Sequence, residues 1–143
     1  MINSRKISDL LPQVAVKAEQ FISQCKAQGI EVLIYSTFRD NESQAALYAQ
    51  GRTAAGKIVT NAKAGHSFHN HRVAFDFVPM LHGKEQWNND ELYHKCGSIA
   101  QACGLEWGGA WKTFADKPHC QDTGGYTIEQ FINKKVPTEW LKS

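Results

Sequence analysis

A short apolar run at residues 73–78, Val-Ala-Phe-Asp-Phe-Val, constrains the fold more than any other segment of the chain. Apolar runs of this length, rich in β-branched and aromatic residues, are typical of buried strands. Pro79 follows the run and is expected to end the strand. Asp76 interrupts the run, so the sequence predicts a buried strand that carries one inward-facing carboxylate.

The rest of the chain predicts helices and a few strands in irregular order. Apolar residues recur at helical spacing from Val14 to Cys25, between Pro12 and a terminating Gly29. The other expected elements are a buried strand at 30–36, a helix from Asp40 or Asn41 to Gly51, a loop at 52–68 with a short extended piece at Ile58-Val59, a helix from Asn88 or Asn89 to Gly104, a strand near 118–121, a short helix capped by Thr127, and a helical turn at 137–141. Because strands and helices do not alternate regularly, we expect an α+β fold with a small, mainly antiparallel sheet flanked by helices.

Length and composition indicate an ordinary globular chain. At 143 residues, with 42% hydrophobic and 21% charged residues, it is expected to form one domain over residues 1–143 and to be neither disordered nor fibrous. Its net charge of +2 is too small for a nucleic-acid-binding surface, and we expect a monomer. No apolar run is long enough to span a membrane or to act as a secretory signal, so we expect synthesis in the cytoplasm and no stable membrane association.

The four cysteines, Cys25, Cys96, Cys103 and Cys120, are expected to be free thiols. Cys25 belongs to the apolar stripe of the first helix, which favours a buried small hydrophobic residue. No Cys-x-x-Cys pair is present, which argues against a cysteine-based structural zinc site.

Histidines near carboxylates and glycines indicate a metal site. His69, Asp76 and His119 would supply two imidazoles and one carboxylate, a ligand set that suits catalytic zinc with one open position. His69 and Asp76 are seven residues apart, so on one continuous strand they would point to opposite faces. The chain must therefore turn between them. Spacing alone leaves a second explanation open, in which Asp76 accepts a backbone hydrogen bond.

Four segments, in order along residues 36–121, resemble the superfamily of L-alanyl-D-glutamate endopeptidases and D-Ala-D-Ala carboxypeptidases, which are zinc peptidases. Residues 67–76 (SFHNHRVAFD) are similar to its S-x-H-x-x-G-x-A-x-D zinc signature. The other three segments are residues 36–39 (STFR) with Gln44 and 47–52 (LYAQGR), residues 106–111 (EWGGAW), and residues 116–119 (DKPH). The resemblance implies a single zinc peptidase domain in which His69, Asp76 and His119 bind Zn²⁺.

The resemblance also implies roles for other residues. Asp116 matches the general base, and Arg39 matches an arginine that stabilises the oxyanion. Glu106 is the reserve candidate for the base. The residues that resemble substrate-contacting or bracing positions are Ser67, Gln44 and Trp107, with Trp111 as a further wall of the groove and His66 and His71 as partners of the metal ligands.

Arg72 stands where the signature has glycine. Glycine at such a position usually serves a tight or left-handed backbone conformation. Arg72 must therefore either adopt that strained conformation or belong to a different turn, which leaves the geometry of the loop between the ligands open.

The resemblance implies hydrolysis of peptidoglycan stem peptides at the L-Ala-D-Glu bond by a phage endolysin that acts on the cell wall during host lysis. Two alternatives remain open, a D,D-carboxypeptidase of the same superfamily and a non-catalytic, zinc-stabilised wall-binding module. The metal preference is also open, since manganese and cobalt accept the same ligands.

Overall fold

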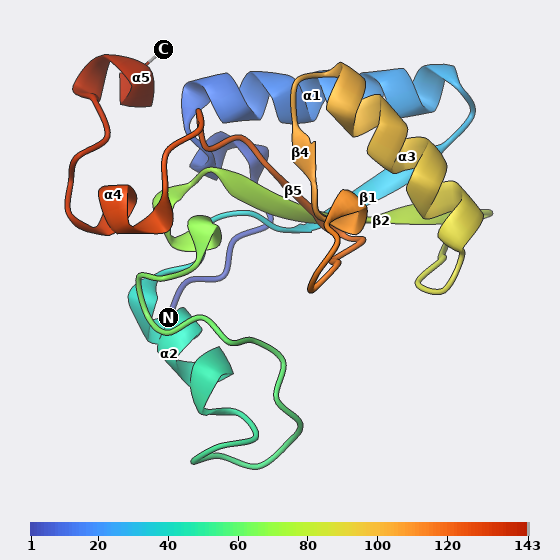
Figure 1. Cartoon of the computed structure of the whole chain (residues 1–143). Coiled ribbons are helices and arrows are strands. Elements are labelled where there is room, and N and C mark those ends of the chain that lie inside the picture. The colour runs from blue at the N-terminus through green and yellow to red at the C-terminus, as the bar shows by residue number, and fades with distance from the viewer. Residues whose placement is uncertain (143) are drawn as a thin grey trace.

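The computed structural model describes residues 1–142, whose centre is an antiparallel sheet (Figure 1). The strands lie in the order β1-β2-β5-β4, and β3 pairs with the far end of β2. Their bounds are β1 Glu31–Ser36, β2 Ala74–Leu81, β3 Lys84–Glu85, β4 Glu106–Trp107 and β5 His119–Gln121. The expected α+β class with a small antiparallel sheet is confirmed.

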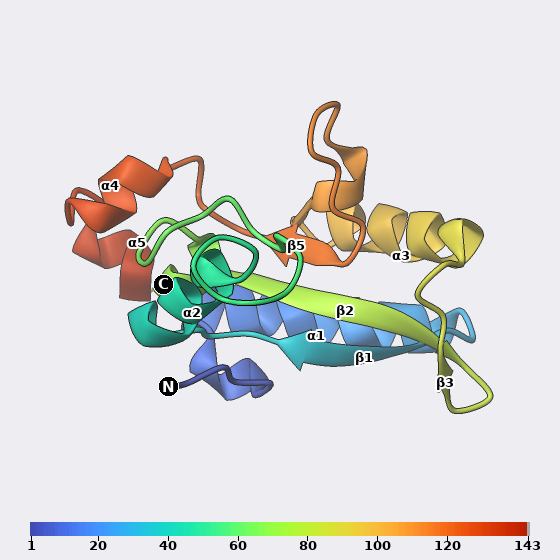
Figure 2. The same ribbon diagram turned by 90° about the horizontal axis from the view of Figure 1, so that it is seen from below.

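Helices α1 (Pro12–Ala27) and α3 (Asp90–Ala102) pack on the same face of this sheet (Figures 1 and 2). The other helices are α2 (Asn41–Ala49), α4 (Ile128–Ile132), α5 (Thr138–Lys142) and the 3₁₀ turns η1 (Ile7–Asp9), η2 (Phe68–His71) and η3 (Gly108–Ala110). The expected side-chain caps are present, since Asp40, Asn89 and Thr127 each accept a hydrogen bond from a backbone N–H in the first helical turn. None of the helices in residues 1–142 is both long and apolar enough to cross a membrane.

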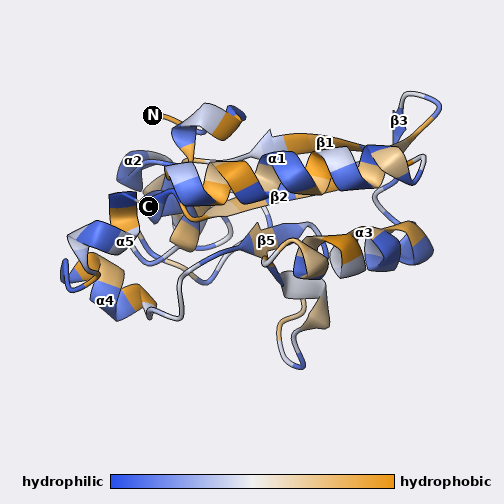
Figure 3. Cartoon of the chain, turned by 90° about the horizontal axis from the view of Figure 1, so that it is seen from above, coloured by the Kyte–Doolittle hydropathy of each residue, from blue (hydrophilic) through white to orange (hydrophobic). Residues whose placement is uncertain are grey.

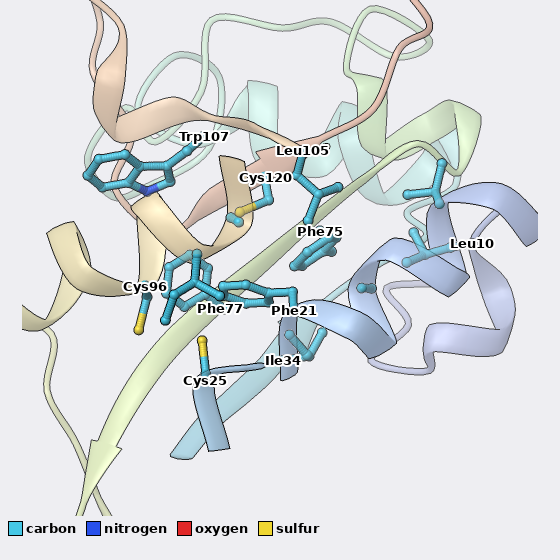
Figure 4. Packing of buried hydrophobic residues seen from close by; sticks show 14 of the residues in the cluster. Leu10, Phe21, Cys25, Ile34, Phe75, Phe77, Cys96, Leu105, Trp107 and Cys120 are labelled. Atoms are coloured by element: carbon cyan, nitrogen blue, oxygen red, sulfur yellow. The ribbon is translucent and has the colours of Figure 1, made fainter. Parts of the chain in front are cut away.

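The core lies between the sheet and these two helices. Hydrophobic and hydrophilic residues alternate along α1, as expected for a helix that buries one side (Figure 3). The ring of Phe21 lies 5.9 Å from Phe75 and 5.0 Å from Phe77 of β2 (Figure 4). The ring of Phe77 lies 5.5 Å from Tyr93 of α3. Since side chains alternate along a strand, Asp76 must point to the opposite face.

The cysteines are free thiols, and three of them contribute to this core. Cys25, Cys96 and Cys120 are buried, whereas Cys103 is half-buried. Figure 4 shows Cys25 and Cys96 among the core side chains. These positions match the expectation that the cysteines act as small hydrophobic residues.

Two local predictions were wrong. The strand does not end before Pro79 but continues to Leu81, with Pro79 opposite Val32 of β1. The C=O of Pro79 accepts from Gln86, and because the N and C=O of a strand residue point to the same side, the missing N–H of proline faces away from β1 and costs the β1–β2 ladder no bond. Ile58-Val59 forms no extended strand, and instead a 3₁₀ turn forms at the end of the predicted loop, over Phe68–His71.

Gly97 allows α3 to approach the sheet. A Cβ at this position would overlap the indole of Trp107, which is held in place because its Nε1 donates to the carbonyl of Lys117 at 2.7 Å. Glycine lowers the stability of a helix interior, but at Gly97 it is the residue that fits the contact.

We expect Gly97→Ala to lower the free energy of unfolding by about 1–3 kcal/mol, because overpacking outweighs the gain in helix propensity. Ser98→Ala, at the exposed neighbouring position of α3, is the matched control and should be neutral or slightly stabilising. Urea unfolding of both variants measures the difference. Equal stability of Gly97→Ala and the wild type would contradict the tight contact.

Candidate metal centre

The structure brings His69, Asp76 and His119 together from three different elements. Asp76 of β2 and His119 of β5 are paired in antiparallel register, so their side chains are neighbours on one face of the sheet. His69 Nε2 lies 3.4 Å from Asp76 Oδ2, and His119 Nδ1 lies 3.4 Å from Asp76 Oδ1. One ligand atom from each residue lies within 4.8 Å of the others. These nitrogen and oxygen donors face a common point, as a metal ion requires.

A short capped turn delivers His69 to this point. Ser67 Oγ accepts from His69 N at 3.2 Å, while Asn70 Oδ1 accepts from Ser67 N at 3.1 Å, which forms a capping box around η2. Asn70 Nδ2 also donates to the carbonyl of Arg39 at 2.8 Å and so ties the turn to the chain after β1. The predicted turn between His69 and Asp76 is this 3₁₀ helix.

Two hydrogen bonds orient the imidazoles. His69 Nδ1 lies 2.9 Å from the carbonyl of Thr37, and His119 Nε2 lies 2.7 Å from Gln121 Oε1. Each oxygen can only accept, so the hydrogen sits on the ring nitrogen that faces it and the other nitrogen keeps a lone pair for a metal. Thr37 and Gln121 therefore take the supporting role expected for His66 and His71. His66 is exposed, whereas His71 Nε2 bonds to the carbonyl of Gly65 at 2.8 Å.

The charge balance at Asp76 favours a cation. Burial would raise the pKa of Asp76, but interactions with His69 and His119 outweigh it and hold the pKa well below its usual range. Burial lowers the pKa of His119, and the hydrogen bond and charge of Asp76 more than compensate, so the pKa is raised. A carboxylate between two imidazoles attracts positive charge, and the donor set fits Zn²⁺.

Arg39 and Gln44 lie beside the metal ligands as one hydrogen-bonded unit. The guanidinium of Arg39 donates to Gln44 Oε1 at 2.8 Å and to Ser36 Oγ at 3.2 Å, while its Nε is buried without a partner among the described residues. Gln44 is fully buried, and its Nε2 donates to the carbonyl of Ala62 at 2.7 Å. The contacts of Gln44 are therefore those of a bracing residue.

Asp116 lies at the mouth of the cleft. Its N–H donates to the carbonyl of Gly108 at 2.9 Å, and its own carbonyl accepts from His119 N at 3.2 Å. A Cβ at Gly108 would overlap the backbone of Asp116, so this glycine permits the approach. The residue is exposed as a whole, but desolvation of its carboxyl on the cleft side raises the pKa, with Asp76 adding to the shift and His119 and His69 opposing it.

The two tryptophans of the W-G-G segment occupy different environments. Trp107 is 5% exposed, packs in the core and does not line the cleft, which corrects its expected place in the groove. Trp111 instead lies 5.4 Å from the ring of His119, and its Nε1 donates to Glu106 Oε2 at 2.7 Å. Glu106 is thereby directed to Trp111 and is absent from the lining of the cleft, which disfavours it as a base.

These groups share a cleft of about 300 Å³. Ser67 lines it, as expected, while its hydroxyl caps η2. Leu47, from the 47–52 segment of the resemblance, also lines the cleft. Val59 and Thr60 line it too but have no recognisable signal in the sequence. The role of Gln121 as a partner of His119 could have been predicted, because residues two apart in a strand share a face and His119 precedes Gln121 by two. The complete lining is Arg39, Leu47, Val59, Thr60, Ser67, His69, Asp76, Asp116 and His119.

Arg72 retains the left-handed conformation that glycine usually serves. Its backbone has φ 65° and ψ 27°, at the C-terminal end of η2. The guanidinium stacks over Phe38, 3.8 Å from the ring centroid, and donates to the carbonyl of Asp9 at 2.8 Å. These contacts offset the backbone strain and leave the positions of His69 and Asp76 intact.

Comparison with known proteins places this site in a family. A family described as D-alanyl-D-alanine carboxypeptidase matches residues 60–122. The chain is 38% identical to the peptidoglycan L-alanyl-D-glutamate endopeptidase CwlK of Bacillus subtilis over 80% of this chain and 74% of that protein. It is 33% identical to an L-alanyl-D-glutamate peptidase of Listeria phage A118 over 92% of this chain and 43% of that protein.

Solved structures share the fold at lower identity. The L-Ala D-Glu endopeptidase ChiX of Serratia marcescens aligns with a TM-score of 0.62 and 21% identity, covering 85% of this chain and 89% of that one. The D,D-pentapeptidase VanY, solved with Zn(II), aligns with a TM-score of 0.59 and 12% identity, covering 92% and 83% of the two chains.

The fold and the relatives define a zinc metallopeptidase. Within that class, the chain belongs to the family that contains the L-alanyl-D-glutamate endopeptidases and the D-alanyl-D-alanine carboxypeptidases.

We expect Gln121→Ala to weaken zinc binding by about 10–100-fold, because the loss of an outer partner frees the ring of a ligating histidine. Gln121→Glu keeps an acceptor for His119 Nε2 and should retain affinity, and Gln101→Ala on the exposed surface of α3 is the control. Competition with a chromophoric chelator measures the affinity. Wild-type affinity in Gln121→Ala would show that Gln121 does not orient His119.

The left-handed backbone of Arg72 predicts an order of stabilities. Arg72→Ala and Arg72→Gly both lose the contacts with Phe38 and Asp9, but only glycine relieves the conformational cost. We therefore expect Arg72→Gly to be more stable than Arg72→Ala by about 1 kcal/mol, measured by urea unfolding. The reverse order would mean that residue 72 is not left-handed in solution.

Proposed function

We propose that this chain hydrolyses peptidoglycan stem peptides at the L-Ala-D-Glu bond, as a monomeric endolysin of the phage type that acts on the cell wall. The observation that carries the proposal is the convergence of His69, Asp76 and His119 with Arg39 and Asp116 in one cleft. The relatives from Bacillus subtilis and Listeria phage A118 support the choice of bond. We further propose that residues 1–143 act as one zinc peptidase domain.

His69, Asp76 and His119 are proposed to hold the ion, through His69 Nε2, His119 Nδ1 and an Asp76 oxygen. Zinc in this position supplies a Lewis acid that polarises the scissile carbonyl and makes water a better nucleophile at neutral pH. All other steps fall to the side chains of the cleft.

Asp116 is proposed to move the proton. Its carboxylate accepts a proton from the attacking water and returns it to the nitrogen of the leaving amine. Desolvation raises the pKa of this carboxyl, which brings it closer to neutral pH and suits a group that must both accept and release a proton.

Arg39 is proposed to stabilise the negative charge that develops on the carbonyl oxygen. Gln44 and Ser36 hold the guanidinium in place before substrate binds, so little reorganisation is needed during the reaction. Burial lowers the pKa of Arg39 and Asp76 opposes the shift. Arginine stays charged because its ordinary pKa lies far above neutral.

A D,D-carboxypeptidase is the second candidate, because the family that matches residues 60–122 is described by that activity. The two reactions release different products from the same wall. The endopeptidase frees the amino group of D-Glu, whereas the carboxypeptidase frees D-Ala.

Digestion of purified peptidoglycan, followed by identification of the new amino termini, decides between them. We expect new D-Glu amino termini and no release of D-Ala. Free D-Ala as the only product would establish the carboxypeptidase instead. Binding to the wall without any new terminus would identify a non-catalytic module.

We expect Asp116→Asn to lower kcat by about 10²–10⁴-fold while zinc content stays at the wild-type level. Glu106→Gln tests the reserve base and should keep most of the activity, because the amide oxygen can still accept from Trp111 Nε1. Initial rates on soluble stem peptide give kcat for each variant. If Glu106→Gln loses activity and Asp116→Asn does not, Glu106 is the base.

A further inference from the structure

A second hollow continues from the metal cleft and is not used by the proposed chemistry. It measures about 840 Å³ and lies between the loop at residues 59–66 and the loop at 111–116. Val59, Thr60 and Asp116 line both this hollow and the metal cleft. We call the second hollow the side groove. Because the two spaces share these three residues, a chain bound across the candidate metal ligands has room to extend into the side groove.

Phe114 makes one wall of the side groove and is unusual in two respects. Its side chain is 87% exposed, and its backbone has φ 52°, a left-handed conformation that is rare for a bulky residue. An exposed ring gains no burial energy to offset that strain in the free protein. Strained backbone that burial does not explain is concentrated at functional sites.

Val59 lines the side groove from the other loop, and hydrogen bonds to its neighbours hold that loop in place. Its side chain is 57% exposed. Gln44 Nε2 donates to the carbonyl of Ala62 at 2.7 Å, and Arg52 donates to the carbonyl of Thr60 at 3.1 Å. The guanidinium of Arg52 also stacks on Tyr48 of α2, 3.9 Å from the ring centroid. The wall is therefore built before any ligand binds.

The charge around the side groove suits an acidic ligand. No Asp or Glu lies between Glu42 and Asp76, a stretch that contains Arg52, Lys57 and Lys63. The facing loop adds Lys112, and its one acidic residue is Asp116, the proposed general base. Both loops extend below the sheet, on the side away from α1 (Figure 1). An anionic chain is therefore attracted to this edge of the metal cleft.

We propose that Phe114 and Val59 are specificity-determining residues that clasp the stem peptide next to the scissile bond. They contact its methyl and methylene groups, while the basic residues of the two flanking loops attract its free carboxylates. This inference rests on the proposed function, since it takes the stem peptide as the ligand.

Replacement of Phe114 tests the clasp. Phe114→Asn removes the ring but tolerates a left-handed backbone, and Phe114→Tyr keeps the ring. We expect Phe114→Asn to raise KM for soluble stem peptide about tenfold with kcat nearly unchanged, because the lost contact is made equally before and during the reaction. Phe114→Tyr should restore the wild-type KM, and zinc affinity should be the same in both.

Trp87→Ala is the matched control, because Trp87 is 51% exposed and does not line the side groove. It should leave KM unchanged. A wild-type KM in Phe114→Asn, or an equal rise in Trp87→Ala, would overturn the clasp. A stem peptide with amidated carboxylates should have a higher KM than the free acid at low salt, and equal values would overturn the role of the basic loops.

Equilibrium binding of the stem peptide in the Asp116→Asn background separates this inference from the proposed function. Calorimetry there should show the same tenfold loss for Phe114→Asn. If the wild type does not cut the L-Ala-D-Glu bond but this loss is observed, the proposed function fails and the clasp stands. If the wild type cuts the bond and binding is unchanged, the clasp fails alone.

Discussion

The whole site depends on the alternation of side chains along β2. Phe75 and Phe77 pack against Phe21 of α1, which fixes the face that the strand turns to the core. Asp76 lies between them, so its side chain points to the opposite face of the sheet. The register with β5 places it there beside His119. A shift of one residue would bury the carboxylate among phenylalanines and turn both rings outward. The hydrophobic core thus holds the register on which the proposed metal ligands Asp76 and His119 depend.

The third proposed ligand, His69, is positioned by a local turn and not by the sheet. A 3₁₀ turn with a capping box carries His69, and Arg72 ends that turn in a left-handed conformation. Glycine would adopt this conformation at little cost, whereas Arg72 adopts it with its guanidinium anchored to Phe38 and Asp9. With Arg72 in place of glycine, side-chain contacts replace the conformational freedom of glycine, and the backbone keeps the same left-handed turn.

The sequence predicts those parts of the molecule that periodicity and local chemistry determine. The core-facing stripe of α1, the approximate helix starts capped by Asp40, Asn89 and Thr127, and a carboxylate on a buried strand follow from spacing and residue type. The face of that carboxylate does not, because Asp76 turns to the cleft and not to the core. The positions of the other site residues depend on tertiary contacts. Trp107 packs in the core because Gly97 leaves space for its indole. His69 is supported by the backbone carbonyl of Thr37, and a contact with a backbone atom cannot be recognised from residue types.

Gln44 connects Arg39 in the metal cleft with the loop that lines the side groove. It is fully buried, its oxygen accepts from Arg39 and its nitrogen donates to Ala62 in the loop that carries Val59. With donor and acceptor both engaged, the amide cannot rotate without leaving a buried polar group unpaired, which is costly. Gln44 therefore holds both the guanidinium of Arg39, which is proposed to face the reacting carbonyl, and the loop that carries Val59.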